Sequence, residues 1–321
     1  MYLLLFQAVE NMLILGIDTS CDDTSAAVVE NGSRIISNIV SSQDEIHKKY
    51  GGIVPELASR RHIEMILPVV DAATKKAGIN VSDISAVAVS RGPGLIGSLL
   101  VGVCFAKSLS FVHNIPLIAV NHLEGHIFSI FLEAKPDFPF IALVVSGGHT
   151  SIYIVEHFGV YTEVGRTRDD AAGEAYDKVA KLLGFAYPGG PVLDKIAKDG
   201  NPEAISFPRA NLGKSFDFSF SGLKTSVLNY TKKYPESGKE DIAASFQASV
   251  VDVLTTRLLD VARQKGISRV VLSGGVSANS ALRESIIKIA SKEKSIGIIG
   301  LGYVGLPLAV AFAEKNVCCR L

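Results

Sequence analysis

The apolar positions divide this chain into short runs typical of buried strands and longer stretches with helical spacing. Two runs, Leu13–Ile17 and Ala26–Val29, flank a turn of small and acidic residues and predict a β-hairpin. From Ile53 to Ala77 apolar residues recur every three or four positions, which predicts a helix. The pattern continues with a strand, a helix and a strand, at Ile84–Val89, Ser98–Val112 and Pro116–Val120.

The second half repeats this arrangement. The runs Ile141–Val145 and Ser151–Val155 flank the small polar turn Ser146–Thr150. A third such turn, Ser273–Asn279, follows the strand pattern Arg269–Leu272 and opens a helix. Two strand–turn–strand units, each followed by helices, predict a duplicated α/β architecture of two lobes with a cleft between them.

The three small-residue turns suggest phosphate binding. Backbone N–H groups of such turns can converge on an anion, and a following helix N-terminus adds partial positive charge. Three turns at strand ends favour a nucleotide site over simple chain reversal. Asp18, Asp22 and Asp23, beside the first turn, can orient a magnesium ion that accompanies the nucleotide, or the substrate itself. They can equally be ordinary hairpin-turn carboxylates.

His122 and His126 are spaced to lie on one face of a helix, where two imidazoles can bind one metal ion. Leu123 stands where the zinc-peptidase motif HExxH has its catalytic glutamate. A histidine pair with this spacing is more often structural. This one follows a strand end, where open α/β sheets place their ligands, so the metal and structural readings stay balanced.

Composition limits the class of protein. The 32 basic and 32 acidic residues cancel, so a nucleic-acid substrate needs a local basic patch or a partner protein. The four cysteines form no disulfide or zinc pattern, which fits a reducing, cytoplasmic location.

Residues 1–11 are apolar without the features of a signal peptide, and we interpret them as an extension. Ile296–Ala313 is uncharged, but its four glycines and Pro307 make a membrane helix the weaker interpretation.

Nine motifs, taken in order, resemble one family, the tRNA N6-adenosine threonylcarbamoyltransferases (the TsaD family, long labelled O-sialoglycoprotein endopeptidase). They are GIDTSCDDT (Gly16–Thr24), GGIVPELASRRH (Gly51–His62), GPGL (Gly92–Leu95), NHLEGH (Asn121–His126), SGGHT (Ser146–Thr150), DDAAGEAYDKVAKLLG (Asp169–Gly184), YPGGP (Tyr187–Pro191), FSFSGLKT (Phe218–Thr225) and SGGVSAN (Ser273–Asn279).

The resemblance implies the actin/Hsp70/sugar-kinase-like (ASKHA) fold and an acyltransferase activity. That activity is transfer of the threonylcarbamoyl group from L-threonylcarbamoyladenylate to N6 of adenosine 37 in ANN-decoding tRNAs. It also implies a TsaB-like paralogous partner and a TsaE-like ATPase. No membrane partner is expected. We expect lobe I at residues 12–121 and lobe II, with the metal and nucleotide site, at residues 122–294.

The same resemblance implies roles for individual residues. One divalent ion, Fe²⁺ or Zn²⁺, would be bound by His122 and His126. Asp18 and Asp23 would be catalytic; Asp23 stands where the family often has glutamate. Lys224 is either a phosphate contact or a structural lysine. The substrate would be bound by Val144, Val145, Ser146, Gly147, Gly148, Asp177, Gly190, Asp194 and Asn279.

The resemblance stops near Lys294. Family members continue with a strand and a Thr-Asp-Asn segment whose aspartate is a further metal ligand. Here, residues 295–321 resemble the first βα unit of a nucleotide-sugar dehydrogenase, with Gly300, Gly302 and Gly305 as a GxGxxG fingerprint. One such unit cannot bind NAD by itself, so we interpret the tail as a foreign fragment without a cofactor role. We therefore expect weakened metal binding and low or absent transferase activity.

Three alternative functions stay open. A metallopeptidase fits the older family label but lacks a glutamate general base beside His122. A phosphotransferase of the sugar- or acetate-kinase kind would share the fold. A non-catalytic scaffold that keeps only nucleotide binding would fit the altered C-terminus.

Overall fold

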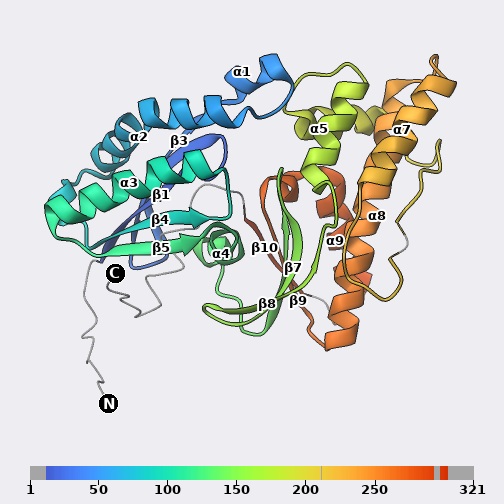
Figure 1. The fold of residues 1–321 in the computed structure, drawn as a ribbon. Helices are drawn as coiled ribbons and strands as arrows, with labels where there is room; N and C mark the ends of the chain where they lie inside the picture. Colours follow the sequence, from blue (N-terminus) through green and yellow to red (C-terminus); the bar gives the residue numbers. More distant parts are fainter. Residues whose placement is uncertain (1–11, 211, 293–296, 303–321) are drawn as a thin grey trace. The chain divides into compact units, whose positions relative to one another are not determined.

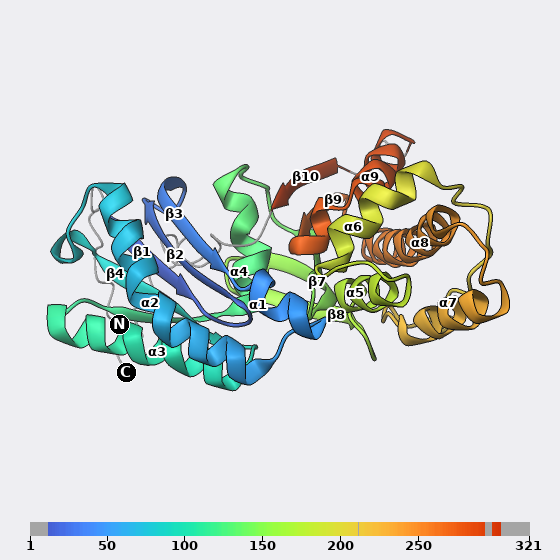
Figure 2. The same cartoon turned by 90° about the horizontal axis from the view of Figure 1, so that it is seen from above.

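A computed structural model describes residues 12–210, 212–292 and 297–302, so the predicted extension at residues 1–11 lies outside the described residues. The described chain forms two compact units. The first comprises residues 12–46 and 53–135, and the second comprises residues 47–52 and the described residues from 136 to 302. Each unit contains a five-stranded sheet (Figures 1 and 2).

The first sheet has the strand order β3-β2-β1-β4-β5. The predicted hairpin is confirmed, because β1 pairs antiparallel with β2 and the register joins Ile17 to Ala26. On its other side β1 pairs parallel with β4, which pairs parallel with β5. The strands are β1 (Leu13–Asp18), β2 (Asp23–Glu30), β3 (Arg34–Ser42), β4 (Ala86–Gly92) and β5 (Leu117–Asn121).

Two long helices cover this sheet. After the short helix α1 (Asp44–His47), α2 (Pro55–Ala77) packs against β2 and β3, and α3 (Ile96–His113) packs against β4 and against α2 (Figure 1). The helix predicted over Ile53–Ala77 is present but begins two residues later, at Pro55. Proline is favoured in a first helical turn because the N–H groups there have no partner within the helix, and proline has no N–H. The core between helices and sheet contains Leu15, Ile17, Ile66 and Val70.

The second sheet repeats the pairing of the first, with the order β10-β9-β6-β7-β8. Here β6 takes the place of β1: it pairs antiparallel with β7 and parallel with β9. The predicted duplication is therefore confirmed. The strands are β6 (Phe140–Val145), β7 (Thr150–His157), β8 (Val160–Arg166), β9 (Arg269–Ser273) and β10 (Gly297–Gly302).

Helices pack around a large apolar core in the second unit. The longest, α8, contributes Phe246, Val250 and Leu254, all without exposed surface. The helices are α5 (Ala172–Leu182), α6 (Gly189–Ile196), α7 (Ser221–Lys233), α8 (Lys239–Lys265) and α9 (Ser280–Lys292).

The first strand of the tail extends the second sheet. β10 pairs parallel with β9, and the register joins Gly302 to Ser273. Gly305, the last glycine of the predicted fingerprint, lies outside the described residues. The interpretation of residues 295–321 as a foreign dehydrogenase-like fragment stays a prediction, but its first strand is part of the second unit's sheet.

Gly274, after β9, is required by both backbone and packing. Its φ is 91°, and a Cβ there would lie 2.3 Å from the carbonyl oxygen of Val145. We expect Gly274→Ala to lower the free energy of unfolding by about 2–5 kcal/mol, through strain and overpacking. Urea unfolding followed by circular dichroism measures this change. Gly275→Ala is the matched control, since no atom lies within 4 Å of its Cβ position. Equal stability of the two variants would contradict the prediction.

Candidate metal centre and nucleotide-binding turns

The histidine pair lies at the carboxyl edge of the first sheet. β1, β4 and β5 are parallel, so Asp18 at the end of β1 and Asn121 at the end of β5 lie on the same edge. Asn121 starts α4 (His122–Phe128), because its Oδ1 accepts hydrogen bonds from the N–H groups of Leu123 at 2.9 Å and Glu124 at 3.3 Å. The lobe boundary drawn from the sequence fell before His122, whereas the structure groups α4 with the first unit.

His122 and His126 face each other through their Nε2 atoms, which are 3.2 Å apart. Their ring centroids are 4.6 Å apart, with an angle of 76° between the ring planes. Two nitrogens bound to one ion at about 2.1 Å are separated by roughly 3.0 Å at a right angle and 3.4 Å at a tetrahedral angle. The spacing of the pair therefore fits two ligands of one divalent ion.

The histidine pair is not part of a larger cluster of metal-binding side chains in the part of the chain that the structure describes. Residues 12–210, 212–292 and 297–302 contain no group of three or more His, Cys, Asp or Glu side chains arranged to hold a metal ion. Closed metal sites use three or four protein ligands, more than the two imidazoles supply by themselves.

Asp18 contacts the histidine pair directly. Its Oδ2 lies 3.0 Å from His122 Nδ1, and its Oδ1 accepts a hydrogen bond from the Ser20 N–H at 2.8 Å. Burial alone would raise the pKa of Asp18, but His122 and the hydrogen bonds from Ser20 outweigh burial and hold it well below its ordinary value. Asp18 is therefore an ionised carboxylate at neutral pH.

The pKa of Asp23 is shifted in the opposite direction from that of Asp18. Partial withdrawal from water raises its pKa to about 6, and the nearby carboxylates of Asp22, Asp44 and Asp18 act in the same direction, against a hydrogen bond from Ser42. Asp23 thus exchanges its proton closer to neutral pH than an ordinary aspartate, which suits a group that accepts a proton.

The raised pKa of Asp23 predicts a pH dependence of stability. The folded protein binds this proton more tightly than the unfolded chain, so the stability it contributes is present below pH 3.8 and is lost as pH rises through about 6. We expect Asp23→Asn to raise the melting temperature above pH 6 and to flatten its change between pH 4 and pH 6. Thermal melts of both proteins across this range measure the effect. Parallel pH profiles would contradict it.

In the second unit, Ser146 and His149 hydrogen-bond to each other across a turn, and the two glycines between them are exposed. The Ser146 N–H donates to the His149 carbonyl at 2.8 Å, and the His149 N–H donates to Ser146 Oγ at 3.1 Å. Gly147 and Gly148 are exposed, with no atom within 4 Å of their Cβ positions. Val144 and Val145 have no exposed surface, so they can reach a substrate only through backbone atoms.

Three polar residues that the sequence predicts to bind the substrate each accept a hydrogen bond at the start of a helix. Asp177 Oδ1 accepts from the Gly189 N–H at 2.7 Å, at the start of α6. Asp194 accepts from Ser280 Oγ at 2.8 Å, at the start of α9. Asn279 Oδ1 accepts from the Leu282 N–H at 3.0 Å. These contacts link α5, α6 and α9, and Gly190, at the start of α6, has open space around it.

Gln247 was not predicted from the sequence. Asn279 Nδ2 donates to Gln247 Oε1 at 2.7 Å, and the Tyr176 hydroxyl donates to the same oxygen at 3.3 Å. All three side chains are buried. The sequence shows only that a glutamine occurs within the apolar helix α8. It does not indicate that this glutamine contacts Asn279.

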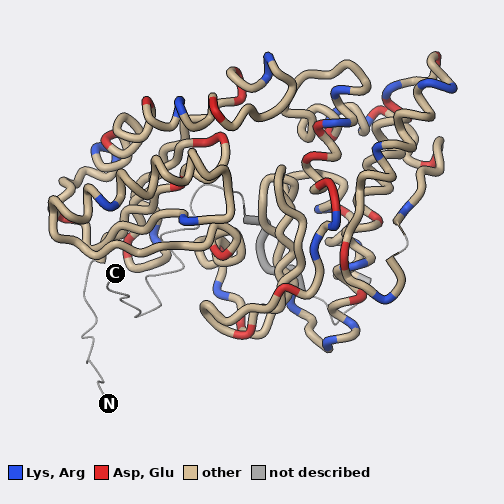
Figure 3. The backbone as a smooth tube through the Cα atoms, viewed as in Figure 1, with Lys and Arg blue, Asp and Glu red and all other residues tan. Residues whose placement is uncertain are grey.

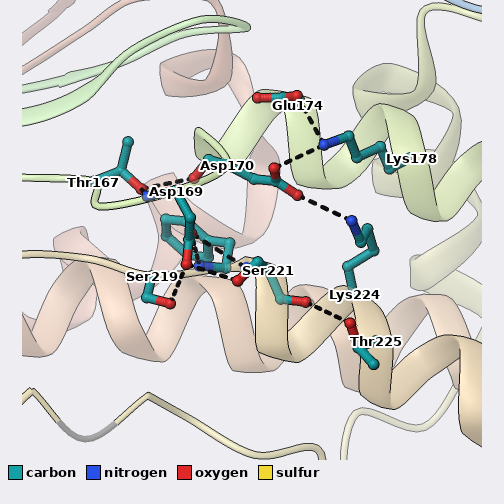
Figure 4. A network of polar contacts seen from close by, with 10 residues as sticks. Thr167, Asp169, Asp170, Glu174, Lys178, Ser219, Ser221, Lys224 and Thr225 are labelled. Carbon is teal, nitrogen blue, oxygen red and sulfur yellow. Dashed lines mark hydrogen bonds and ion pairs between the residues drawn. The ribbon is translucent and has the colours of Figure 1, made fainter.

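A second network holds the start of α7 (Figure 4). Asp169 accepts hydrogen bonds from the hydroxyls of Ser219 at 2.5 Å and Ser221 at 2.7 Å, and from the N–H of Phe220 at 2.8 Å. Lys224 Nζ lies 3.5 Å from Asp170 Oδ2. The structure therefore gives Lys224 an ion-pair partner. The motifs containing Asp169 and Ser221 were visible in the sequence, but their contact was not.

Comparison with known proteins settles the family. The family model described as TsaD: tRNA N6-adenosine threonylcarbamoyltransferase matches residues 34–299. The chain belongs to the TsaD family. A tRNA N6-adenosine threonylcarbamoyltransferase of Thermodesulfovibrio yellowstonii is 58% identical over 295 residues, covering 89% of this chain and 88% of the relative. One of Syntrophus aciditrophicus is 53% identical over 292 residues, covering 89% and 86%. The family and the acyltransferase class predicted from the motifs are confirmed.

Solved structures match this TsaD chain in fold. Full-length HypF in its phosphate- and nucleotide-bound form matches with a TM-score of 0.62 and 16% identity, over 95% of this chain and 56% of that one. Component A of (R)-2-hydroxyglutaryl-CoA dehydratase from Acidaminococcus fermentans matches with a TM-score of 0.54 and 14% identity, over 94% and 95%. At this identity the matches show the fold alone, and they confirm the predicted ASKHA-type α/β fold.

Proposed function

We propose that this protein transfers the threonylcarbamoyl group from L-threonylcarbamoyladenylate to N6 of adenosine 37 in ANN-decoding tRNAs. The observation that carries the proposal is 58% identity over 295 residues to a tRNA N6-adenosine threonylcarbamoyltransferase. The paired imidazoles of His122 and His126 and the open turn at Gly147 and Gly148 support it.

The chemistry asks mainly for positioning and charge stabilisation, since the carbamoyl adenylate is already an activated mixed anhydride. Backbone N–H groups of the turn after β6 would hold the phosphate, and Asp177, Asp194 and Asn279 would set the position of the ribose. His122 and His126 would hold one divalent ion, Fe²⁺ or Zn²⁺, which when bound polarises the carbonyl as a Lewis acid. Asp23, with a pKa of about 6, is our candidate for the proton acceptor.

An exposed apolar face on the first unit supports a protein partner, which we propose is a TsaB-like paralogue. Ile63 and Leu67 on α2 are 65% and 64% exposed, and Ile96, Leu100 and Phe111 on α3 are 80%, 57% and 88% exposed. Lys107 is the one Lys, Arg, Asp or Glu residue of α3, so the helix is almost uniformly tan in Figure 3. Several large apolar side chains exposed on two packed helices are typical of an interaction site.

Two helices among the described residues are long and apolar enough to cross a membrane, by length and composition only. They are α3, with 17% of its 18-residue window buried, and α8, with 67% buried. Core helices of soluble proteins pass the same test, so this is weak evidence. We propose a cytoplasmic protein that also works with a TsaE-like ATPase.

We expect Leu100→Asp to disrupt the complex with the paralogous partner, because a charge would be buried at an apolar interface. Size-exclusion chromatography of the mixed proteins measures complex formation. Ile287→Asp is the matched control, since Ile287 is 54% exposed on α9 of the other unit. Flotation of the wild type with lipid vesicles, and no complex with the paralogue, would contradict this assignment of the surface.

The deciding experiment combines the protein with threonylcarbamoyladenylate, unmodified ANN-decoding tRNA and both partners, and measures modified adenosine by mass spectrometry. We expect slow formation of the modified nucleoside, and none on a tRNA with guanosine at position 37. Casein cleavage without modification would support the metallopeptidase instead. Nucleotide binding without either reaction, even after the C-terminal replacement described in the Discussion, would support the non-catalytic scaffold.

A further inference from the structure

The contacts of His122 give Asp18 a specific role. We propose that Asp18 is a positioning residue, which fixes the tautomer and the direction of the His122 ring for a divalent ion. It would not itself touch the substrate. This inference rests on the metal site of the proposed function and deepens it.

The first step is the proton on His122. An ionised carboxylate can only accept a hydrogen bond, so the ring nitrogen that faces it must carry the proton. Asp18 Oδ2 lies 3.0 Å from His122 Nδ1, and Ser20 Oγ lies 3.1 Å from the same nitrogen. Nδ1 is therefore the protonated nitrogen, and Nε2, which faces His126, keeps the lone pair that a metal needs.

The second step is the orientation of the carboxylate. Asp18 Oδ1 accepts a hydrogen bond from the Ser20 N–H at 2.8 Å, so the side chain is held at both oxygens. The side chains of Asp18 and His122 are each 13% exposed, so little water competes for their contact. A carboxylate held in this way fixes the direction of the imidazole ring.

The third step excludes direct ligation by Asp18 in the observed arrangement. One oxygen faces the turn and the other faces Nδ1, the ring nitrogen that points away from His126. The ligand atoms of the pair, the two Nε2 atoms, are on the other side of the His122 ring. Asp18 thus contacts His122 on the side of the ring opposite to the proposed ligand atom, Nε2.

Two substitutions of Asp18 separate positioning from simple structural support. In Asp18→Asn, the Ser20 N–H still needs the oxygen, so the amide nitrogen faces His122 and moves its proton to Nε2, where it blocks a metal. In Asp18→Ala, the Ser20 cap is lost, but Ser20 Oγ can still accept from Nδ1. A structural role predicts that alanine is worse. The positioning role predicts that asparagine is worse.

The test is titration of the metal-free proteins with Co²⁺ alone, followed by absorbance and calorimetry. We expect the Co²⁺ dissociation constant to rise about 100-fold in Asp18→Asn and about tenfold in Asp18→Ala. Asp71→Asn, which removes a surface carboxylate paired with Lys75 in the same unit, should bind Co²⁺ like the wild type. Nitrogen-15 chemical shifts should show the His122 proton on Nδ1 in the wild type and on Nε2 in Asp18→Asn.

Unchanged Co²⁺ affinity in Asp18→Asn would overturn the inference, as would a larger loss in Asp18→Ala than in Asp18→Asn. If His126→Ala also binds Co²⁺ like the wild type, the metal site itself is wrong, and this assignment falls with it. Loss of affinity in His126→Ala with none in Asp18→Asn would overturn only the role of Asp18.

Discussion

Replacing His126 by alanine should abolish metal binding and lower threonylcarbamoyl transfer by about 100-fold or more. The pair is held at an Nε2–Nε2 distance of 3.2 Å, and the described residues offer no group of three metal-binding side chains. Loss of one imidazole therefore leaves a single ligand of the pair among the described residues, too few to retain an ion. The Lewis-acid contribution that we propose for the ion would be lost with the metal.

Titration of the metal-free proteins with Co²⁺ and formation of modified adenosine, measured together, test this prediction. His126 is 2% exposed, so melting temperatures must show that the variant is folded, and His126→Gln gives a second variant of more similar size. His113→Ala, at the exposed end of α3 in the same unit, should retain both properties. Full transfer activity in folded, metal-free His126→Ala would show that the reaction does not use this pair.

The sequence predicts the features of this site that depend on local spacing. His122 and His126 are one helical turn apart, so their shared face follows from the helix period alone. The hairpins β1–β2 and β6–β7 are equally local, because each pairs two apolar runs across a short turn. The edge strands β3 and β8 were not predicted, since their many exposed polar residues hide the apolar alternation.

The contacts that complete the site join distant segments. Asp18 and His122 are 104 residues apart and meet only because β1 and β5 end at the same edge of the sheet. Gln247 reaches Asn279 from the middle of α8, and the two are 32 residues apart. A sequence pattern shows which residue types are present, but such pairs depend on strand order and helix packing. The sequence predicted Asp18 as a catalytic group, and the structure adds its contact with His122, which no sequence pattern indicated.

Restoring the family's C-terminal segment should strengthen the metal site. We expect a chimera in which residues 295–321 are replaced by the corresponding segment of the Thermodesulfovibrio yellowstonii relative to bind Co²⁺ about 10- to 100-fold more tightly. The resemblance to the family predicts that this segment brings an aspartate ligand, and a third ligand completes a set that closed sites require. Transfer to tRNA should rise with metal occupancy.

The second sheet makes this exchange structurally conservative. β10 pairs with β9 through backbone hydrogen bonds, so a donor strand can pair in its place, provided that its register keeps residue 302 beside Ser273. A chimera whose donor aspartate is changed to alanine is the matched control. It keeps the strand and should lose the gain in affinity. If both chimeras bind Co²⁺ equally well, or if the unaltered protein already holds a stoichiometric, tightly bound ion, the missing carboxylate does not limit this site.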